Sequence, residues 1–244
     1  DLGGATANGD LSTSVGAPLE SSPCKPRNSP VQDVSLEAMT PPPARLEAGL
    51  AALGLDPSPD QRLQLMQFLD LLARWNRTYN LTAVKDPLEM VSRHLLDSLA
   101  VFPFLLGSSV LDLGTGAGLP GLPLAILDPE RRFVLLDSNG KKIRFVRQAK
   151  MDLGLTNVEP VQARMESYRP REKFATIISR AIANEKDWRL AVRPLLASPG
   201  RLLAMKGRRP DAELAALTAF EPIIHRLDVP FLHAERHLIE IHQD

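Results

Sequence analysis

The segment VLDLGTGAGLPG, residues 110–121, joins a short apolar run to a glycine-rich turn. The apolar run predicts a buried strand, and the glycines predict a tight connection into a following helix. Read from Gly116, the turn satisfies G-x-G-x-x-G, the pattern of dinucleotide-binding loops. Read from Asp112, it is D-x-G-x-G-x-G, with a carboxylate two residues before the first glycine. The two readings indicate different cofactors, so the rest of the chain has to decide between them.

Short apolar runs alternate with amphipathic stretches on both sides of this turn. The runs cover 109–113, 132–137, 174–179 and 200–205, and the amphipathic stretches cover 120–128, 139–153, 184–197 and 210–219. This alternation predicts an α/β fold, with a parallel sheet covered by helices on both faces. The last run, His237 to His242, alternates as an antiparallel edge strand does.

A helical region precedes the sheet. Helices are expected over 45–54, over 60–77 with Asp60 as N-cap, and from Asp86 to about Leu105 with Pro87 in the first turn. The second of these helices carries one apolar face, formed by Leu63, Met66, Leu69, Leu72 and Trp75.

Residues 1–44 have a different composition from the rest of the chain. They contain seven Pro, six Ser, four Gly and no aromatic residue, with five acids against two bases. Such a segment cannot bury enough apolar surface to offset the entropy of ordering, so we expect a disordered tail. The expected organisation is therefore a tail (1–44), a helical subdomain (45–106) and a cofactor-binding domain (107–244).

Charge, cysteine content and apolar run length limit the function classes. The formal net charge is zero for the whole chain, and residues 45–244 carry a net charge of +3, which is compatible with a nucleic-acid partner. No apolar run approaches the roughly 20 residues that a membrane-spanning helix needs. The single cysteine, Cys24, allows no disulfide within the chain and favours the reducing cytoplasm.

The position of the glycines favours a cationic cofactor over a dinucleotide. In a dinucleotide fold the first glycine of the pattern follows the strand directly, whereas the frame from Gly116 begins two residues late. Asp112 would repel a diphosphate and attract a cation. S-adenosylmethionine carries a sulfonium and an ammonium group and no phosphate. A glycine-rich turn without any cofactor role remains an open alternative.

A second acid supports a nucleoside cofactor. Asp137 ends the run FVLLDS and lies 23 residues after Gly114, close to the spacing of about 20 at which an acid binds a ribose diol. Nicotinamide cofactors and S-adenosylmethionine both contain that ribose, so Asp137 does not choose between them. The alternative is that Asp137 and Ser138 cap the next helix.

Seven ordered blocks give the chain a specific resemblance. They are NRTYNLTAV (76–84), SRHLLDSL (92–99), LDLGTGAGLPGLPLAI (111–126), LLDSNGKKIRFV (135–146), ISRAIA (178–183), LLAMKG (202–207) and ERHLIEI (235–241). In this order they resemble the glucose-inhibited division protein B family, the bacterial guanine-N7 methyltransferases of small-subunit ribosomal RNA. The resemblance covers about residues 46–243, and Ala117 stands where the family more often has proline.

The resemblance implies a Rossmann-like class I methyltransferase with a seven-stranded, mostly parallel sheet. It implies S-adenosylmethionine as cofactor and a guanine of 16S ribosomal RNA, free or in a ribosomal particle, as substrate. The cofactor-binding residues that it implies are Gly114, Leu119, Met165, Glu166 and Arg180, and Asp137 matches the ribose-binding acid of methyltransferases generally. The implied RNA-side residues are Asn80, His94, Arg164, Lys206 and Arg236.

Structural alternatives to these roles remain open. Glu166 could cap a short helix, Arg180 could pair with a neighbouring carboxylate, and Arg93 with Asp97 could form an i,i+4 surface pair. The basic stretch 141–150 is read as a solvated helix face. The spacing of His233 and His237 does not match a metal-binding motif, so we expect no metal.

The chemistry of guanine N7 agrees with what the chain lacks. N7 presents a lone pair in the neutral base, so alignment and exclusion of water suffice and no general base is needed. Pyrimidine C5 methylation through a covalent adduct would need a cysteine nucleophile, and the only thiol lies in the predicted tail. We expect a monomeric enzyme. The competing hypotheses are a methyltransferase of proteins or small molecules, a non-catalytic RNA-binding module, and, most distantly, a nicotinamide oxidoreductase.

Overall fold

The computed structural model describes residues 41–180, 192–208 and 220–244. The chain divides into two compact units, Asp1–Met39 and Thr40–Asp244, and every described residue belongs to the second unit. Residues 1–40 of the predicted tail, most of the predicted amphipathic stretch 184–197 and all of the stretch 210–219 lie outside the described residues.

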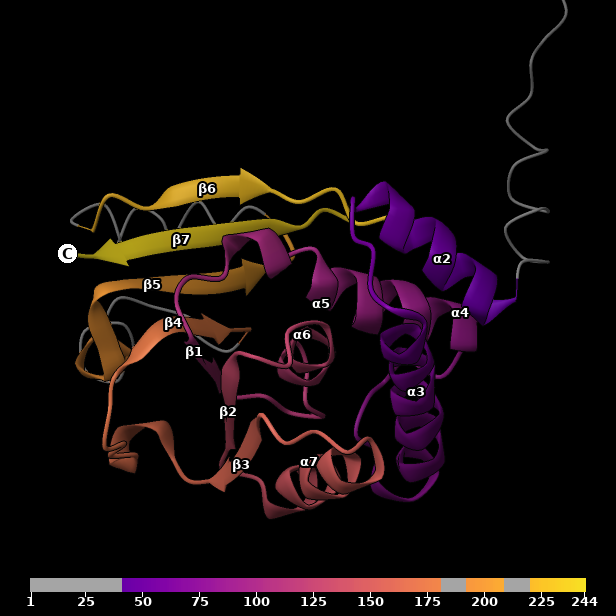
Figure 1. The fold of residues 1–244 in the computed structure, drawn as a ribbon, viewed down its shortest axis with the longest axis horizontal. Helices are drawn as coiled ribbons and strands as arrows, with labels where there is room; N and C mark the ends of the chain where they lie inside the picture. Colours follow the sequence, from indigo (N-terminus) through magenta and orange to yellow (C-terminus); the bar gives the residue numbers. More distant parts are fainter. Residues whose placement is uncertain (1–40, 181–191, 209–219) are drawn as a thin grey trace, which may run out of the picture. The chain divides into compact units, whose positions relative to one another are not determined.

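A seven-stranded sheet forms the centre of the described unit (Figure 1). Its spatial order is β3-β2-β1-β4-β5-β7-β6, in which β1 to β5 pair in parallel while β7 and β6 pair antiparallel. The strand order reverses between β1 and β4, and the crevice at the carboxyl ends of these strands is where such sheets bind ligands. The strands are β1 (Ser109–Leu113), β2 (Arg132–Asp137), β3 (Val158–Gln162), β4 (Phe174–Ser179), β5 (Leu196–Lys206), β6 (Ile223–Arg226) and β7 (His237–Gln243).

The outer strands differ most from the sequence prediction. β7 is antiparallel as expected, but it is not at the edge, because β6 pairs along its outer side. β3 and β6 were absent from the predicted apolar runs. Both are edge strands with few buried residues, and Glu159 and Pro160 interrupt the apolar character of β3. Edge strands need only one protected face, so they carry a weaker apolar signal than central strands.

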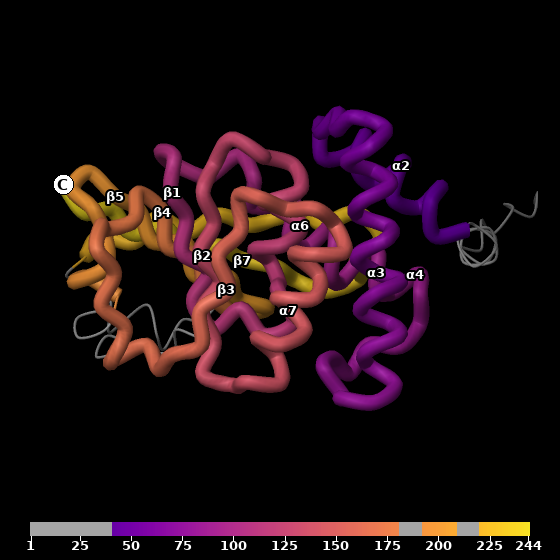
Figure 2. Tube along the Cα trace, turned by 60° about the horizontal axis from the view of Figure 1, so that its bottom comes forward, coloured from indigo at the N-terminus to yellow at the C-terminus, as the bar shows by residue number. Residues whose placement is uncertain are grey.

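The amino-terminal region is helical, as predicted. It consists of α2 (Pro42–Ala52), α3 (Pro59–Tyr79), α4 (Pro87–Met90), the π-helical η1 (Val91–Leu96), α5 (Asp97–Leu99) and the 3₁₀ turn η2 (Phe102–Phe104). Figure 2 shows α3 running beside α6 (Gly121–Leu127) and α7 (Gly140–Asp152). None of the described helices is long and apolar enough to cross a membrane.

Two details of α3 correct the prediction. Its N-cap is Ser58, which forms a reciprocal capping box with Gln61, and Asp60 lies in the first turn instead. Leu63 was expected on the buried face but is 57% exposed. Positions three apart drift by about 60° per step on an α-helix, so a strict three-residue series cannot stay on one face. The buried residues are Leu65, Phe68, Leu69, Leu71, Leu72 and Asn76.

Helices cover one face of the sheet and build the larger core. Phe145 of α7 packs against Phe68 and Trp75 of α3, with ring centroids 6.3 and 5.6 Å apart. The other sheet face carries a second cluster that includes Leu111 and Leu113. Because side chains alternate along β1, the neighbouring Asp112 points to the helical face. The seven-stranded, mostly parallel sheet that the resemblance implies is confirmed.

Candidate functional site

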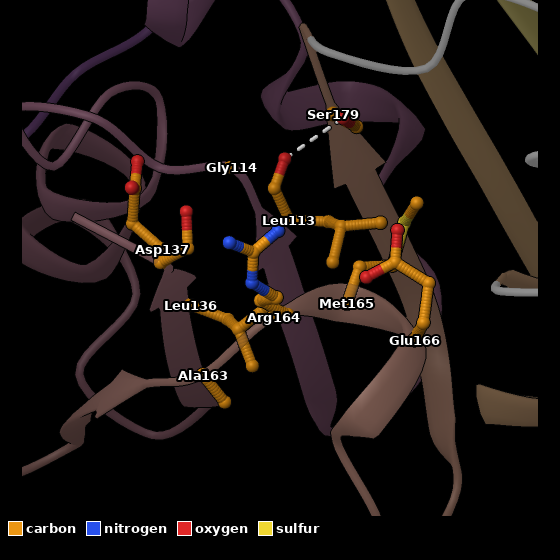
Figure 3. Close-up of a pocket in the computed structure, with 10 residues that line it drawn as sticks. Leu113, Gly114, Leu136, Asp137, Ala163, Arg164, Met165, Glu166 and Ser179 are labelled. Atoms are coloured by element: carbon orange, nitrogen blue, oxygen red, sulfur yellow. Dashed lines mark hydrogen bonds between the residues drawn. The ribbon is translucent and has the colours of Figure 1, made fainter.

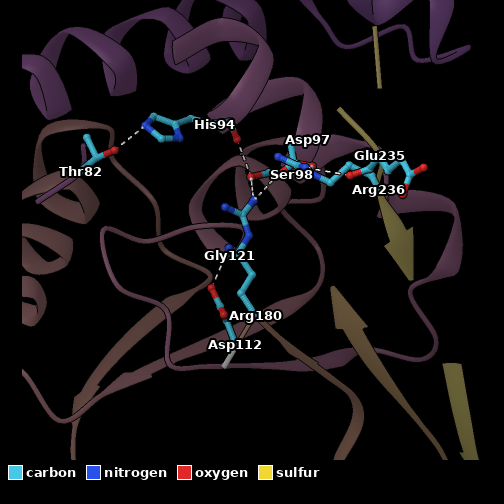
Figure 4. Close-up of polar contacts among 9 residues, drawn as sticks. All are labelled: Thr82, His94, Asp97, Ser98, Asp112, Gly121, Arg180, Glu235 and Arg236. Atoms are coloured by element: carbon cyan, nitrogen blue, oxygen red, sulfur yellow. Dashed lines mark hydrogen bonds and ion pairs between the residues drawn. The ribbon is translucent and has the colours of Figure 1, made fainter. Parts of the chain in front are cut away.

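The loop between β1 and α6 is held by one buried carboxylate. Asp112 Oδ2 accepts a hydrogen bond from the Thr115 hydroxyl at 2.6 Å. It accepts another from the Gly121 backbone N–H at 2.8 Å, which Figure 4 shows. A Cβ on Gly121 would lie 2.7 Å from the same oxygen, so glycine lets the helix start approach the carboxylate. These two hydrogen bonds therefore tie the start and the end of the loop to Asp112 in β1.

This geometry corrects the expected role of Asp112. The residue is 1% exposed, and burial raises the pKa of its carboxyl to about 6, although the bonds from Thr115 and Gly121 act in the opposite direction. Asp112 does not line the cavity described below. It was expected to attract a cationic cofactor, whereas the structure places it under the loop, where it fixes the backbone.

The second acid ties the same loop to β2. Asp137 Oδ2 accepts from the Gly116 N–H at 2.9 Å, and Oδ1 accepts from the Asn139 N–H at 2.8 Å. Asn139, rather than Asp137 or Ser138, caps α7 through its side-chain oxygen. The capping alternative for Asp137 is therefore wrong. The Asp137 carboxylate does not cap α7 and lies beside the loop.

A cavity of about 220 Å³ opens at the carboxyl ends of β1, β2 and β4 (Figure 3). It brings together four predicted cofactor residues, Gly114, Asp137, Met165 and Glu166. Met165 and Glu166 belong to the 3₁₀ turn η3 (Met165–Ser167) after β3. The remaining lining residues are Leu113, Leu136, Ser138, Ala163, Arg164 and Ser179. Arg164 was expected on the RNA side and lies at the cofactor cavity.

The loop offers little to a diphosphate. Dinucleotide sites hold the diphosphate with free backbone N–H groups, but five N–H groups of this loop are donated inside the protein. Gly114 and Thr115 donate to the Leu136 carbonyl, Gly116 to Asp137, Leu119 to the Thr115 carbonyl and Gly121 to Asp112. The dinucleotide pattern that begins at Gly116 is therefore accidental.

The cavity fits a nucleoside with hydroxyl and amino donors. Gly114 lies at its wall with a φ of +74°, a conformation that only glycine adopts readily and that leaves its backbone bare. Carboxylates at Asp137 and Glu166 are acceptors, and each oxygen of Asp137 keeps a lone pair beyond its backbone bond. Leu136, Ala163 and Met165 supply apolar contact. Leu119 is 8% exposed and is not among the lining residues, so the structure does not bring it to the cavity.

A second cluster lies beside the loop, where two arginines share Asp97 (Figure 4). Arg180 Nη2 is 3.1 Å from Asp97 Oδ2, and Arg236 Nε is 2.8 Å from Asp97 Oδ1. Arg180 thus pairs with a neighbouring carboxylate, as the structural alternative to its cofactor role expected. Arg93 pairs with Glu89 at 3.8 Å, so the expected Arg93–Asp97 pair is wrong.

His94 belongs to this cluster and is neutral at physiological pH. Its Nε2 lies 3.0 Å from the Thr82 hydroxyl, and its main-chain carbonyl accepts from Ser98. Burial, followed by the charge of Arg180, lowers the pKa of His94 to about 4. Asn80, two residues before Thr82, is the left-handed C-cap of α3 with a φ of +49°.

The remaining predicted cations lie where β5 ends and β7 begins. Lys206 is the last residue of β5 and pairs in register with His237, the residue after Arg236. Arg208 follows β5, whereas Arg209 lies outside the described residues. The structure therefore places Lys206 and Arg236 at one rim of the site. Within the described part of the chain, no group of three or more His, Cys, Asp or Glu residues could hold a metal ion.

Two solved structures share this fold. A S-adenosylmethionine-dependent methyltransferase from Aquifex aeolicus aligns with a TM-score of 0.50 at 17% identity, covering 64% of this chain and 93% of that one. The pyocyanin biosynthetic protein PhzM aligns with a TM-score of 0.53 at 18% identity, covering 71% of this chain and 62% of that one. At these identities the likeness establishes the fold.

Sequence relatives identify the family. The GidB family profile, described as rRNA small subunit methyltransferase G, matches residues 61–239. Proteins named ribosomal RNA small subunit methyltransferase G are 57% identical in Methylococcus capsulatus and 52% identical in Chromohalobacter salexigens, over 80% and 81% of this chain and 96% of each relative. The chain belongs to this family and is a S-adenosylmethionine-dependent methyltransferase. The expected family, enzyme class and cofactor are confirmed.

Two parts of the site were not found from the sequence. Asp97 was not considered as a partner of Arg180 or Arg236, and Thr82 was not singled out. Asp97 lies three residues after His94, a separation that puts both on one helix face, and this was the available signal. Its arginine partners are 83 and 139 residues away in the chain, so no local pattern shows them.

Proposed function

We propose that this protein transfers a methyl group from S-adenosylmethionine to N7 of a guanine in small-subunit ribosomal RNA. The observation that carries the proposal is the cavity at Gly114, Asp137 and Glu166, beside a loop of which five N–H groups are already donated inside the protein. Membership of a family whose relatives are named for the small-subunit RNA supports the substrate.

The cofactor side of the site uses the cavity residues. Asp137 accepts hydrogen bonds from the ribose hydroxyls, Glu166 accepts from the adenine amino group, and Met165 packs against the ring. Gly114 lets the cofactor approach the main chain, and Leu119 acts through the position of the loop. When bound, S-adenosylmethionine supplies an electrophilic methyl group on its sulfonium.

The acceptor side needs alignment rather than proton transfer. Guanine N7 has a free lone pair, and the nearby His94 is neutral because burial lowers its pKa to about 4. Lys206 and Arg236 hold the RNA phosphates, as cations do in sequence-independent contacts, whereas Arg164 lines the cofactor cavity. Asn80 and His94 shape the surface against which the guanine lies. Orientation and exclusion of water supply the rate acceleration.

The chain is proposed to work as a monomer in the cytoplasm, on ribosomal RNA or on a ribosomal particle. The decisive experiment incubates the purified protein and labelled S-adenosylmethionine with small-subunit particles, with the free RNA and with large-subunit particles from cells lacking the enzyme. We expect label in the small-subunit RNA alone, at one guanine mapped as 7-methylguanine by mass spectrometry.

Other results would identify a competing function. Label in ribosomal proteins or in a small-molecule fraction would indicate a methyltransferase with another substrate. Failure to bind both S-adenosylmethionine and S-adenosylhomocysteine in a calorimetric titration would favour a non-catalytic RNA-binding module.

A further inference from the structure

We propose that Asp97 is a positioning residue that fixes Arg180 and Arg236 with the two oxygens of one carboxylate. This inference rests on the proposed function, in which Arg236 serves the RNA side, and on the cofactor role that the family resemblance implies for Arg180, which is not among the residues that line the cavity. Asp97 then couples the two binding events, because one side chain sets the position of a cation in each half of the site.

Asp97 contacts two arginines that come from different parts of the chain. Asp97 begins α5, Arg180 directly follows β4, and Arg236 directly precedes β7. Oδ2 lies 3.1 Å from Arg180 Nη2, and Oδ1 lies 2.8 Å from Arg236 Nε, so each oxygen holds one guanidinium. Arg180 has a further bond of 3.2 Å to the Ser98 hydroxyl. Three segments distant in the chain therefore meet at one carboxylate.

Asp97 is more deeply buried than the two arginines that it holds. The Asp97 side chain is 5% exposed, whereas those of Arg180 and Arg236 are 31% and 22% exposed. The carboxylate is thus hidden while both guanidinium groups keep a face toward solvent. One negative charge shared by two positive charges leaves an excess of positive charge at the rim, where an RNA phosphate would be attracted.

The neighbouring histidine cannot replace the carboxylate, because an imidazole is neutral or positively charged and supplies no negative charge. His94 lies one helical turn before Asp97, and its lowered pKa keeps it neutral. Loss of Asp97 would leave two guanidinium groups without their shared partner, and each would move to a new one. The expected result is displacement of both arginines while the strands that carry them stay in place.

Substitutions at Asp97 separate position from charge. Asp97→Asn keeps the shape but replaces one acceptor oxygen with an NH₂ donor, which would face a guanidinium donor. It can therefore hold at most one arginine. Asp97→Glu keeps both acceptors and the charge but displaces them by one methylene. We expect Asp97→Glu to recover part of what Asp97→Asn loses.

The test measures KM for RNA, KM for S-adenosylmethionine and kcat in Asp97→Asn, Arg236→Ala, Arg180→Ala and the two double variants with Asp97→Asn. We expect Asp97→Asn to raise both KM values, that for RNA by about tenfold or more. The double variant with Arg236→Ala should match Arg236→Ala alone in KM for RNA. The double variant with Arg180→Ala should match Arg180→Ala alone in KM for S-adenosylmethionine, because coupled residues are non-additive.

Glu240→Gln is the matched control. Glu240 is also a buried carboxylate bound to an arginine, with Arg201 Nε at 3.0 Å and its own side chain 6% exposed. It lies three residues along β7 from His237, away from the rim. Glu240→Gln should lower Tm without changing either KM. The variant thus shows the effect of losing a buried carboxylate that has only a structural role.

Four results would overturn the inference, and they point to three different failures. Additive effects in the double variants, or an Asp97→Asn variant that loses Tm but keeps both KM values, would show that Asp97 is only structural. If Arg236→Ala and Arg180→Ala themselves leave both KM values unchanged while the enzyme methylates RNA, the assigned roles of these arginines fail. If the wild-type protein methylates no RNA, the proposed function itself fails.

Discussion

The Gly116 N–H donates to Asp137 Oδ2 at 2.9 Å, which ties the glycine loop after β1 to the end of β2. One side chain thus has two tasks, since the carboxylate holds the loop in shape and borders the cavity that the loop helps to form. The shape of the loop and the chemistry of the cavity are therefore expected to change together when Asp137 is altered.

Asp137→Asn should weaken cofactor binding by about tenfold to a hundredfold. Both oxygens accept a backbone N–H, from Gly116 and from Asn139. The amide NH₂ of asparagine would face one of these donors, and a lost hydrogen bond to a charged group costs about 1.5–3 kcal/mol. Calorimetric titration with S-adenosylhomocysteine measures the change. Asp128→Asn, which removes a partner of Arg131, is the control and should bind normally.

Gly114→Val should abolish cofactor binding, whereas Gly116→Val should retain part of it. Both glycines have positive φ, of 74° and 60°, so both substitutions strain the backbone. Gly114 also lines the cavity, while a Cβ on Gly116 would meet only atoms at 3.9 Å or beyond. Equal affinities of the two variants for S-adenosylhomocysteine would contradict the assignment of Gly114 to the cavity wall.

Asp112→Asn should change how stability depends on pH. Burial raises the pKa of Asp112 from 3.8 to about 6 in the folded protein. Between these values the folded protein keeps a proton that the unfolded chain has lost, so this group destabilises the wild type as pH rises toward 6. Both bonds to the loop reach Oδ2, so an asparagine carbonyl can keep them.

Urea unfolding at pH 4, 5, 6 and 7 measures this effect. The free energy of unfolding of Asp112→Asn minus that of the wild type should rise by up to about 3 kcal/mol from pH 4 to 6 and then stay level. A difference that is constant over this range would show that Asp112 titrates normally.

His94→Gln should have the opposite pH effect. The pKa of His94 is lowered from 6.5 to about 4 in the folded protein, so the unfolded chain takes up the proton first as pH falls. The wild type should therefore lose stability relative to His94→Gln as pH falls from 6.5 to 4, by up to about 3 kcal/mol. The same urea titrations measure it. A parallel pair of curves would contradict the lowered pKa.

The central strands could be predicted from the sequence because they are buried on both faces. β2 and β4 coincide with their apolar runs, 132–137 and 174–179, since nearly every residue of such strands is apolar. β3 could not be found in this way, because Glu159 and Pro160 occupy an edge strand with one exposed face. The position of β7 inside the sheet depends on β6, which has only a short, weakly apolar signal.

The candidate site was predictable where it follows strand ends. Gly114 directly follows β1 and Asp137 is the last residue of the neighbouring parallel strand β2, so sheet topology alone places them together. The orientation of Asp112 was not predictable in practice, because the sequence did not show that Thr115 and Gly121 would occupy its carboxylate. The assignments of Met165, Glu166 and the RNA-side residues came from family resemblance, and their roles stay predictions.

The π-helical turn η1 has a consequence for insertions and deletions. The Asp97 N–H bonds to the Ser92 carbonyl five residues back, so this turn holds one residue more than an α-helical turn would. Each residue of an α-helix turns the chain by about 100°. A deletion of one residue between 91 and 96 would leave an ordinary α-helical turn, in which four residues turn the chain nearly as far as five do in the π-helical turn, so Asp97 would keep its direction. An inserted residue would add a further rotation and turn Asp97 away from both arginines, so this segment should tolerate the loss of one residue better than the gain of one.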